Sequence, residues 1–270
     1  MTRARAHAKI NLALVVGPRR PDDKHEVATV LQAVDLRDDI ALERGDELSV
    51  EGFEEDTLVR GALEALARKA DVEPAWSVRI EKRIPVAAGL GGGSSDAATA
   101  LRLANATLAA PLPPESLHEL AANLGADVPF FLASGPQLAT GDGSELSPLA
   151  LPVDYVVLVV LPEGQRKEST ASVYRSFDGR QGDRDFETRR DGLLHALGSV
   201  NIGRDLAALP PNDLASSPVS TELVRLGAFR ADVSGAGPAV YGLFEADPVA
   251  RRAAGSLRRV GPTWLARPVG

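Results

Sequence analysis

The chain of 270 residues contains no cysteine, and this absence excludes disulfide bonds, thiolate metal sites and a cysteine nucleophile. It also lacks an excess of positive charge, because 30 lysines and arginines face 37 acidic residues and give a formal net charge of −7. A nucleic-acid-binding surface needs a basic face, so we expect no nucleic-acid partner. An anionic substrate must then be held by local positive charge.

Aromatic residues make up only 4% of the chain, and long apolar runs are missing. The longest run, Val156 to Leu161, is far too short to span a bilayer, so we expect no membrane association. Residues 1–7 show no leader pattern before the first predicted strand. We therefore expect a cytoplasmic protein that acts on a small molecule.

The length allows a substantial core, in one large domain or two smaller ones. The segment 147–152 reads Ser-Pro-Leu-Ala-Leu-Pro and is typical of a domain boundary. We therefore predict an N-terminal domain of residues 1–150 and a C-terminal domain of residues 151–270. Strand and helix patterns are mixed in both parts and favour the α+β class.

The predicted elements follow from apolar periodicity and from turn and cap residues. Strands are expected at 8–16, 29–36, 39–43, 48–51, 76–81, 154–161, 231–234, 239–244 and 263–267. Helices are expected at 57–70, from 97 to about 108, at 114–124, at 170–177 within the polar stretch 163–190, and from Pro248 with Asp247 as its N-cap.

The glycine run Gly89-Leu90-Gly91-Gly92-Gly93-Ser94-Ser95-Asp96 is the most informative stretch. Glycine loses more backbone entropy on folding than any other residue, so four in five positions need a reason. The run lies between a predicted strand and a predicted helix, where free amides and the helix dipole bind anions. Ser94 and Ser95 stand where a helix cap is expected. The run therefore predicts a phosphate or nucleotide site.

Three other interpretations of this run make different demands on the sequence. A Walker-type loop would place a lysine after Gly93, and none is there. A dinucleotide fingerprint needs an acidic residue at the end of a second strand about 20 positions later, whereas residues 109–114 form a proline-rich connection. A flexible linker is the remaining alternative.

Candidate reactive residues stand in three further segments. The first strand places His7, Lys9 and Asn11 on one face, which is either a solvated face or part of a site. Asp127 is either the N-cap of a helix that begins at Val128, or a half-buried carboxylate tuned by a nearby cation. Residues 233–239 form either a tight hairpin or a second small-residue loop that approaches the glycine run and the transferred phosphate.

In combination these segments resemble the GHMP kinase superfamily, whose three sequence blocks occur here in order. The matching stretches are residues 8–12, 82–98, 125–131, 212–214 and 234–238. Within the superfamily the resemblance is strongest, over nearly the full length, to the kinases of the methylerythritol phosphate (non-mevalonate) route to isopentenyl diphosphate. It implies an N-terminal domain like ribosomal S5 domain 2, a C-terminal ferredoxin-like α/β sandwich, and an active site in the cleft between them.

The resemblance also implies an ATP-dependent kinase that phosphorylates a hydroxyl of cytidine diphosphate methylerythritol, giving the 2-phosphate and ADP. It implies a catalytic pair in which Asp127 accepts or orients the hydroxyl proton while Lys9 keeps Asp127 ionised and stabilises the transition state. Mg²⁺ would be carried by ATP, with Ser95 as its candidate protein contact. The implied ATP-binding residues are Pro85, Val86, Ala87, Ala88, Gly89, Leu90, Gly91, Gly92, Gly93, Ser94 and Ser95, and the loop that closes the pocket is Ser234, Gly235, Ala236 and Gly237.

The implied substrate-binding residues are Asn11, Lys24, His25 and Tyr174. One of them departs from the family pattern, because Lys24 stands where these kinases carry a tyrosine that stacks on cytosine. Tyr174 is the candidate for the second stacking aromatic. Stacking is worth about 1–3 kcal/mol, so the loss of one face predicts binding weaker by about one to two orders of magnitude. Lys24 would recover part of this by pairing with the substrate diphosphate.

Two other functions are alternatives. Lys24 motivates a GHMP kinase for another small alcohol, of the homoserine or mevalonate phosphate type. A catalytically silent nucleotide-binding sensor on the same scaffold would lack the lysine–aspartate pair, whereas Lys9 and Asp127 are both present. A monomer and a homodimer are both compatible with the sequence.

Overall fold

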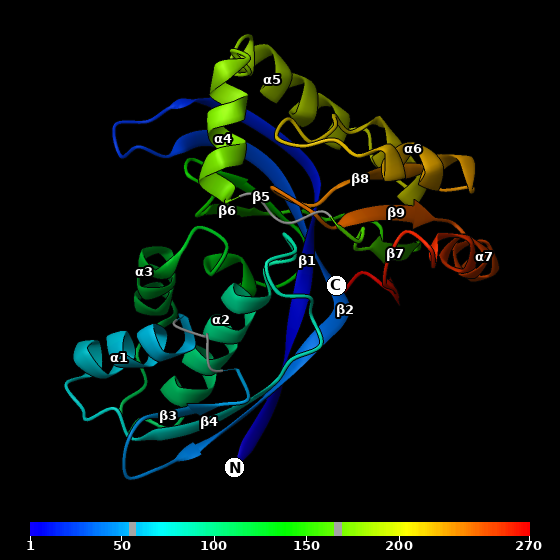
Figure 1. Ribbon diagram of the computed structural model, residues 1–270. Helices are drawn as coiled ribbons and strands as arrows, with labels where there is room; N and C mark the ends of the chain where they lie inside the picture. The colour runs from blue at the N-terminus through cyan, green and yellow to red at the C-terminus, as the bar shows by residue number, and fades with distance from the viewer. Residues whose placement is uncertain (54–57, 165–168) are drawn as a thin grey trace. The chain divides into compact units, whose positions relative to one another are not determined.

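A computed structural model describes residues 1–53, 58–164 and 169–270 of the chain. Its strands are β1 (Thr2–Arg19), β2 (His25–Arg44), β3 (Ser49–Glu51), β4 (Trp76–Glu81), β5 (Gln137–Thr140), β6 (Glu145–Pro148), β7 (Val156–Val160), β8 (Arg230–Val233), β9 (Val240–Phe244) and β10 (Thr263–Ala266). Its helices are α1 (Leu58–Ala70), α2 (Gly92–Asn105), α3 (Pro114–Leu124), α4 (Thr170–Gly179), α5 (Phe186–Leu197), α6 (Pro218–Arg225), α7 (Asp247–Leu257) and the 3-10 helices η1 (Pro129–Leu132) and η2 (Gly203–Ala208) (Figure 1).

The chain forms two compact units that interleave along the sequence. The first unit consists of Met1–Ala8, Arg37–Val86 and Gly91–Ser134. The second consists of Lys9–Leu36, Ala87–Leu90 and Gly135–Gly270. The predicted domain boundary near residue 150 stays a prediction, because these units are not continuous in sequence.

The first unit is a sheet covered on one face by helices. Strand β4 pairs antiparallel with β2, with Ile80 opposite Ile40, and parallel with β3. Alternate strand residues such as Leu42 and Val78 pack with α1 and α2 in one buried apolar cluster, and both helices lie on the same side of β3 and β4 (Figure 1). Burying one such side chain contributes about 1.5–3 kcal/mol, so the apolar alternation dictates which face the helices cover.

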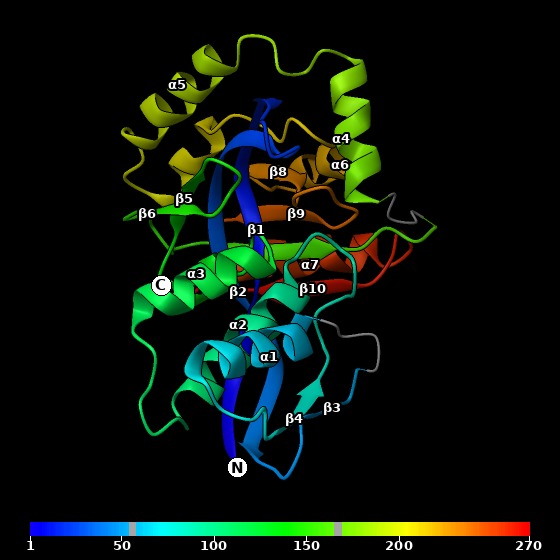
Figure 2. The same cartoon turned by 90° about the vertical axis from the view of Figure 1, so that its left-hand side faces the viewer.

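The second unit contains a four-stranded antiparallel sheet in the order β10-β7-β9-β8 (Figure 2). Alternate residues of β7, such as Val156 and Leu158, pack in one cluster with apolar residues of α6 and α7. The intervening residues are also buried, which explains why β7 is apolar at every position. From β9, Tyr241 donates a hydrogen bond to the Asn11 carbonyl of β1 at 2.9 Å, and burial raises its pKa to about 12.

The structure confirms the α+β class and changes several predicted elements. The expected strands 29–36 and 39–43 form one strand, β2, because the two residues between them keep the extended conformation. Among its described residues, the polar stretch 163–190 holds α4 and the beginning of α5, where one helix was expected. Asp247 is the first residue of α7, and Ala246 is its N-cap. Among the described residues, no helix is both long enough and apolar enough to cross a membrane.

Candidate functional site

In the first unit the glycine run opens helix α2. Gly91 is the N-cap residue with a φ of 69°, a left-handed conformation that favours glycine. The helix begins at Gly92, so Ser94 and Ser95 lie in its first turn and the prediction that they cap it is wrong. The left-handed turn at Gly91 starts the helix earlier than a serine cap would. The first-turn amides of a helix have no intrahelical acceptor, so this end suits an anion.

Three charged side chains hold this helix end to the sheet of the first unit. Lys82, just after β4, lies 2.6 Å from a carboxylate oxygen of Asp38 and 2.7 Å from one of Asp96. Asp38 also accepts the backbone N–H groups of residues 83 and 84, at 2.5 and 2.8 Å. We call Lys82, Asp38 and Asp96 the Lys82 cluster. It joins β2, the end of β4 and the first turns of α2.

The Lys82 cluster has one cation for two fully buried carboxylates. Burial, and then the charge of Asp38, raise the pKa of Asp96 to about 8, although Lys82 acts in the opposite direction. One Asp96 oxygen, Oδ1, is buried with no hydrogen-bond partner. Burial lowers the pKa of Lys82, but the charges and hydrogen bonds of Asp96 and Asp38 have the larger combined effect and raise it. A protonated Asp96 makes the cluster neutral.

Asp127 also belongs to the first unit, in the turn between α3 and η1. It is half-buried, as the sequence predicts. The N-cap of η1 is Val128, so the alternative that Asp127 caps this helix is wrong. The 3-10 helix begins one residue later than a cap at Asp127 would require. The catalytic role of Asp127 stays a prediction.

In the second unit, Lys9 is buried within β1 and only 3% exposed. Its Nζ donates a 2.7 Å hydrogen bond to Asn11 Oδ1, and Asn11 Nδ2 donates to Thr29 Oγ1 at 2.9 Å. The Thr29 hydroxyl in turn donates to the Ala13 carbonyl at 2.7 Å. This chain of bonds fixes the direction of the lysine side chain. The alternative of a solvated strand face is therefore wrong.

The second small-residue segment is both a hairpin connection and a partner of the glycine run. It joins β8 to β9, whose last pair is Val233 with Val240. Ser234 Oγ donates to the Gly89 carbonyl at 2.9 Å, and the Ala239 amide donates to the Ala88 carbonyl at 3.0 Å. We call residues 234–239 the hairpin loop.

Close packing requires a glycine at position 89 of this contact. A Cβ atom on Gly89 would lie 2.3 Å from the Ser234 carbonyl oxygen, so no larger residue fits there. A Cβ atom on Gly235 would lie 3.4 Å from Lys9 Nζ and 3.4 Å from Asn11 Oδ1. The second unit thus gathers Lys9 and Asn11 of the first strand, Gly89 at the start of the glycine run, and the hairpin loop.

The predicted base-binding residues also meet in the second unit. The rings of His25 and Tyr174 lie 4.7 Å apart, and His25 Nε2 lies 2.7 Å from Asp178 Oδ1. Asp178 is a residue that sequence reasoning missed. It is separated from His25 by 153 positions, and no local pattern connects them.

Lys24, the departure from the family pattern, pairs with Asp142 in the turn between β5 and β6. Burial opposes the charge of Asp142, but hydrogen bonds from Lys24 and Ser144 outweigh it and lower the Asp142 pKa to about 2. Asp142 was not a predicted site residue either. The ammonium group of Lys24 thus has a carboxylate partner within the protein.

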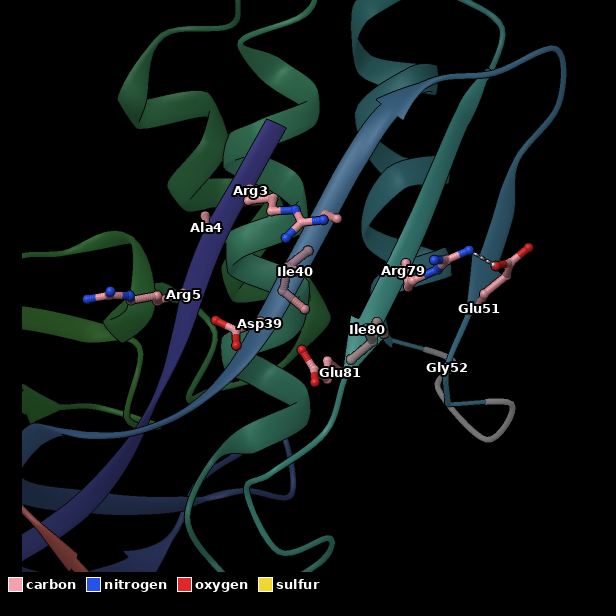
Figure 3. A pocket seen from close by; sticks show the side chains of 11 residues that line it. Arg3, Ala4, Arg5, Asp39, Ile40, Glu51, Gly52, Arg79, Ile80 and Glu81 are labelled. Atoms are coloured by element: carbon pink, nitrogen blue, oxygen red, sulfur yellow. Dashed lines mark hydrogen bonds and ion pairs between the residues drawn. The ribbon is translucent and has the colours of Figure 1, made fainter. Parts of the chain in front are cut away.

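A pocket of about 790 Å³ lies on the face of the first unit's sheet that the helices leave open (Figure 3). Its charged lining residues include Arg3, Arg5, Asp39 and the ion pair of Arg79 with Glu51, whose N–O distance is 3.3 Å. None of the predicted site residues lines it. Because arginines and carboxylates both line it, the pocket favours neither an anionic nor a cationic ligand.

Comparison with known proteins identifies the family. The model of the GHMP kinases N terminal domain matches residues 57–135. The 4-diphosphocytidyl-2-C-methyl-D-erythritol kinases of Chlorobium chlorochromatii and Pelotomaculum thermopropionicum are 36% and 38% identical, over 94% and 95% of this chain and 92% and 93% of theirs. A crystal structure of 4-(cytidine 5'-diphospho)-2C-methyl-D-erythritol kinase is 34% identical, covers 100% of both chains and gives a TM-score of 0.81.

The chain belongs to the 4-diphosphocytidyl-2-C-methyl-D-erythritol kinases of the GHMP kinase superfamily. This membership confirms the GHMP kinase fold and the predicted class of enzyme, an ATP-dependent small-molecule kinase. Membership in this group of GHMP kinases does not by itself assign a role to any residue of the chain. The roles of the individual site residues stay predictions.

Proposed function

We propose that this GHMP kinase transfers the γ-phosphoryl group of ATP to a hydroxyl of 4-diphosphocytidyl-2-C-methyl-D-erythritol, giving the 2-phosphate and ADP. The observation that carries the proposal is the placement of Lys9. Its amine is buried, directed by Asn11 and next to Gly235 of the hairpin loop, which itself contacts the glycine run. Phosphoryl transfer depends mainly on positioning and charge stabilisation, and this arrangement offers both.

In the proposed reaction Lys9 and Asp127 act on the same hydroxyl. Asp127 accepts or orients the hydroxyl proton, and the ammonium group of Lys9 favours the ionised form of that carboxylate. Lys9 also stabilises the negative charge that develops on the transferred group. The proposal requires the two side chains to reach the substrate hydroxyl together.

The glycine run fits a triphosphate. Gly91 to Gly93 carry no side chains that would keep a phosphate from the first-turn amides of α2. Among the described residues there is no cluster of three or more His, Asp or Glu side chains for a metal. Mg²⁺ would enter on the nucleotide and would help to neutralise the charge of its phosphates. Ser95, in the first turn of α2, remains the candidate contact to it.

The cytidine end of the substrate is proposed to bind near His25 and Tyr174. Tyr174 offers an aromatic face for the base, and Asp178 fixes the orientation of the His25 ring. Lys24 is held by Asp142, so a substrate diphosphate has to compete with a carboxylate for it. We therefore expect a higher KM for the cytidine substrate than in a relative with a tyrosine at this position.

The test is a competition assay with the purified protein, ATP and Mg²⁺, in which the cytidine substrate, homoserine and phosphomevalonate compete as acceptors. We expect phosphate transfer to the cytidine compound. Transfer to another alcohol instead would make the chain a GHMP kinase of different specificity. A rate of ADP formation that is the same with and without each alcohol would refute the kinase assignment. In Asp127→Asn, turnover should be lost while calorimetry still detects ATP binding.

A further inference from the structure

The segment Asn212-Asp213-Leu214 belongs to the family's sequence pattern, and the proposed reaction gives it no role. In the structure it lies beside β1, with a parallel bridge between Asn212 and Leu14 and a 2.9 Å hydrogen bond from the Asp213 amide to the Leu14 carbonyl. This is the strand that carries Lys9. The segment therefore connects the strand of the proposed catalytic lysine with the residues that the Asn212 side chain contacts.

Asn212 contacts the hairpin loop and uses all of its side-chain hydrogen-bonding groups. Its Nδ2 donates to the Val233 carbonyl at 2.9 Å and to the Gly235 carbonyl at 2.7 Å. Its Oδ1 accepts the Leu214 amide at 2.8 Å. The residue is only 8% exposed, so these bonds have little competition from water.

The hairpin loop needs such an anchor because its own residues supply little packing. Gly235 and Gly237 adopt φ angles of +56° and +74°, and neither has a side chain. The loop nevertheless has neighbours on both sides, since Ser234 bonds to Gly89 and a Cβ atom on Gly235 would lie 3.4 Å from the Lys9 amine. The Asn212 bond to Gly235 acts between these two contacts.

Asn212 is itself held by buried charges. Its backbone amide donates to Asp232 Oδ2 at 2.8 Å, and Asp232 lies 3.5 Å from Arg230. Arg230 donates to the carbonyls of Leu209 and Pro210 at 2.5 and 2.8 Å. A side chain supported in this way has few alternative positions, so a loop that depends on it is fixed as well.

We propose that Asn212 is a positioning residue of the phosphoryl-transfer site, which sets the hairpin loop against Lys9 and Gly89 through its two N–H donors. This inference rests on the proposed function for its kinetic consequence and on geometry alone for its structural one. A displacement of about 1 Å at a transfer site can cost about 100-fold in rate. Loss of the donors should therefore lower kcat far more than it changes the KM for ATP.

The experiment compares Asn212→Asp with the matched control Asn105→Asp in the full-length protein. Asn105 is 7% exposed, donates Nδ2 to the Leu112 carbonyl at 3.0 Å and accepts the Leu112 amide at 2.8 Å, at the far end of α2 from the glycine run. Both substitutions keep the shape and remove a buried donor. We expect kcat to fall about 10- to 100-fold in Asn212→Asp, with the KM for ATP within about threefold, and no such fall in the control.

A second measurement does not depend on turnover. Hydrogen–deuterium exchange of the ligand-free protein should show faster exchange of the amides of residues 234–239 in Asn212→Asp than in wild type and control. If Asn212→Asp does not fold, Asn212→Ser replaces it with the same expectations. Wild-type kcat, or unchanged exchange in the hairpin loop, would overturn the inference.

Failure of the proposed kinase reaction can be distinguished from failure of the proposed role of Asn212. The kinetic comparison uses whichever alcohol the wild-type protein phosphorylates, so a different substrate leaves it valid. If no alcohol is phosphorylated, the exchange measurement still decides whether Asn212 sets the hairpin loop. A double variant, Asn212→Asp with Ser234→Ala, should lose less activity than the product of the single losses, because both residues act through the same loop. Fully multiplicative losses would contradict the inference.

Discussion

Lys82 in the first unit and Lys9 in the second each take part in a polar network, and the two networks contain different side chains. In the first unit Lys82 lies between two carboxylates, at 2.6 and 2.7 Å. In the second unit Lys9 donates to Asn11, whose amide oxygen is neutral, at 2.7 Å. The Asn11 contact directs the ammonium group and leaves its charge in place.

Lys82 holds structure, whereas Lys9 is the lysine of the proposed reaction. The charge of Lys82 is needed by Asp38 and Asp96, which would otherwise be buried without a cation. The Asn11 bond orients Lys9, and in the proposed reaction its charge acts on the substrate. The networks also differ in what they join: the Lys82 cluster ties α2 to a sheet, whereas Lys9 and Asn11 share one strand.

The largest effect is expected for Lys9→Ala. Loss of a preorganised cation at a developing negative charge should lower kcat by about 1,000-fold or more, while ATP binding measured by calorimetry stays within about threefold. A variant that retains wild-type kcat would make the two lysines equivalent and refute the comparison.

Lys82→Met should act on stability instead. It removes the cation shared by two buried carboxylates, so the free energy of unfolding should fall by about 3 kcal/mol, as measured by urea titration. The control is Arg225→Met, which breaks an exposed ion pair with Glu222 and should cost less than about 1 kcal/mol. Equal losses in the two variants would mean that the Lys82 cluster is not structural.

Asn11→Asp converts the second network into one like the first. A carboxylate at this position would bind the Lys9 ammonium group and partly neutralise its charge, and it would lose the Nδ2 donor to Thr29. We expect kcat to fall about 10- to 100-fold, since an interaction with the transition state is weakened. Steady-state kinetics at saturating ATP check this, with Asn105→Asp as the control. An unchanged kcat would show that the neutrality of this contact is unimportant.

The last prediction concerns pH and the Lys82 cluster. The Asp96 pKa is raised from 3.8 to about 8 in the folded protein, so the folded state binds more protons than the unfolded state between these values. Stability therefore falls as pH rises through this window, and the loss is complete above about pH 8. Asp96→Asn lacks this ionisation. Its Tm relative to wild type should rise between about pH 5 and about pH 9, and a constant difference would contradict the assignment.

Local sequence patterns predicted most elements and the segments of the site. Helix α3 has the predicted bounds, 114–124, because a proline opens it and a glycine follows its last residue. The glycine run was located correctly, although the helix begins at Gly92 and no serine caps it. The predicted contact between the hairpin loop and the glycine run is present, through Ser234 and Gly89.

Local sequence patterns could not predict the contacts between residues that are far apart in the chain. Asp38 and Lys82 are 44 positions apart, and a charged residue near a strand end is usually solvated. Their buried pairing follows only when β2 and β4 lie side by side. The same holds for Asp178 with His25, where helix α4 has to pack near the start of β2 before the contact exists.

By itself, the sequence determined the periodic elements, the glycine run before a helix, and the family blocks that contain Lys9 and Asp127, because these depend on residues close together in the chain. Only the tertiary structure decided that Lys9 is directed by Asn11 and Thr29, that Lys82 is held by two carboxylates, and that Asn212 anchors Gly235. The physical reason is that a buried polar group takes its partner from whatever the fold brings within hydrogen-bond distance, and separation along the chain does not limit that choice.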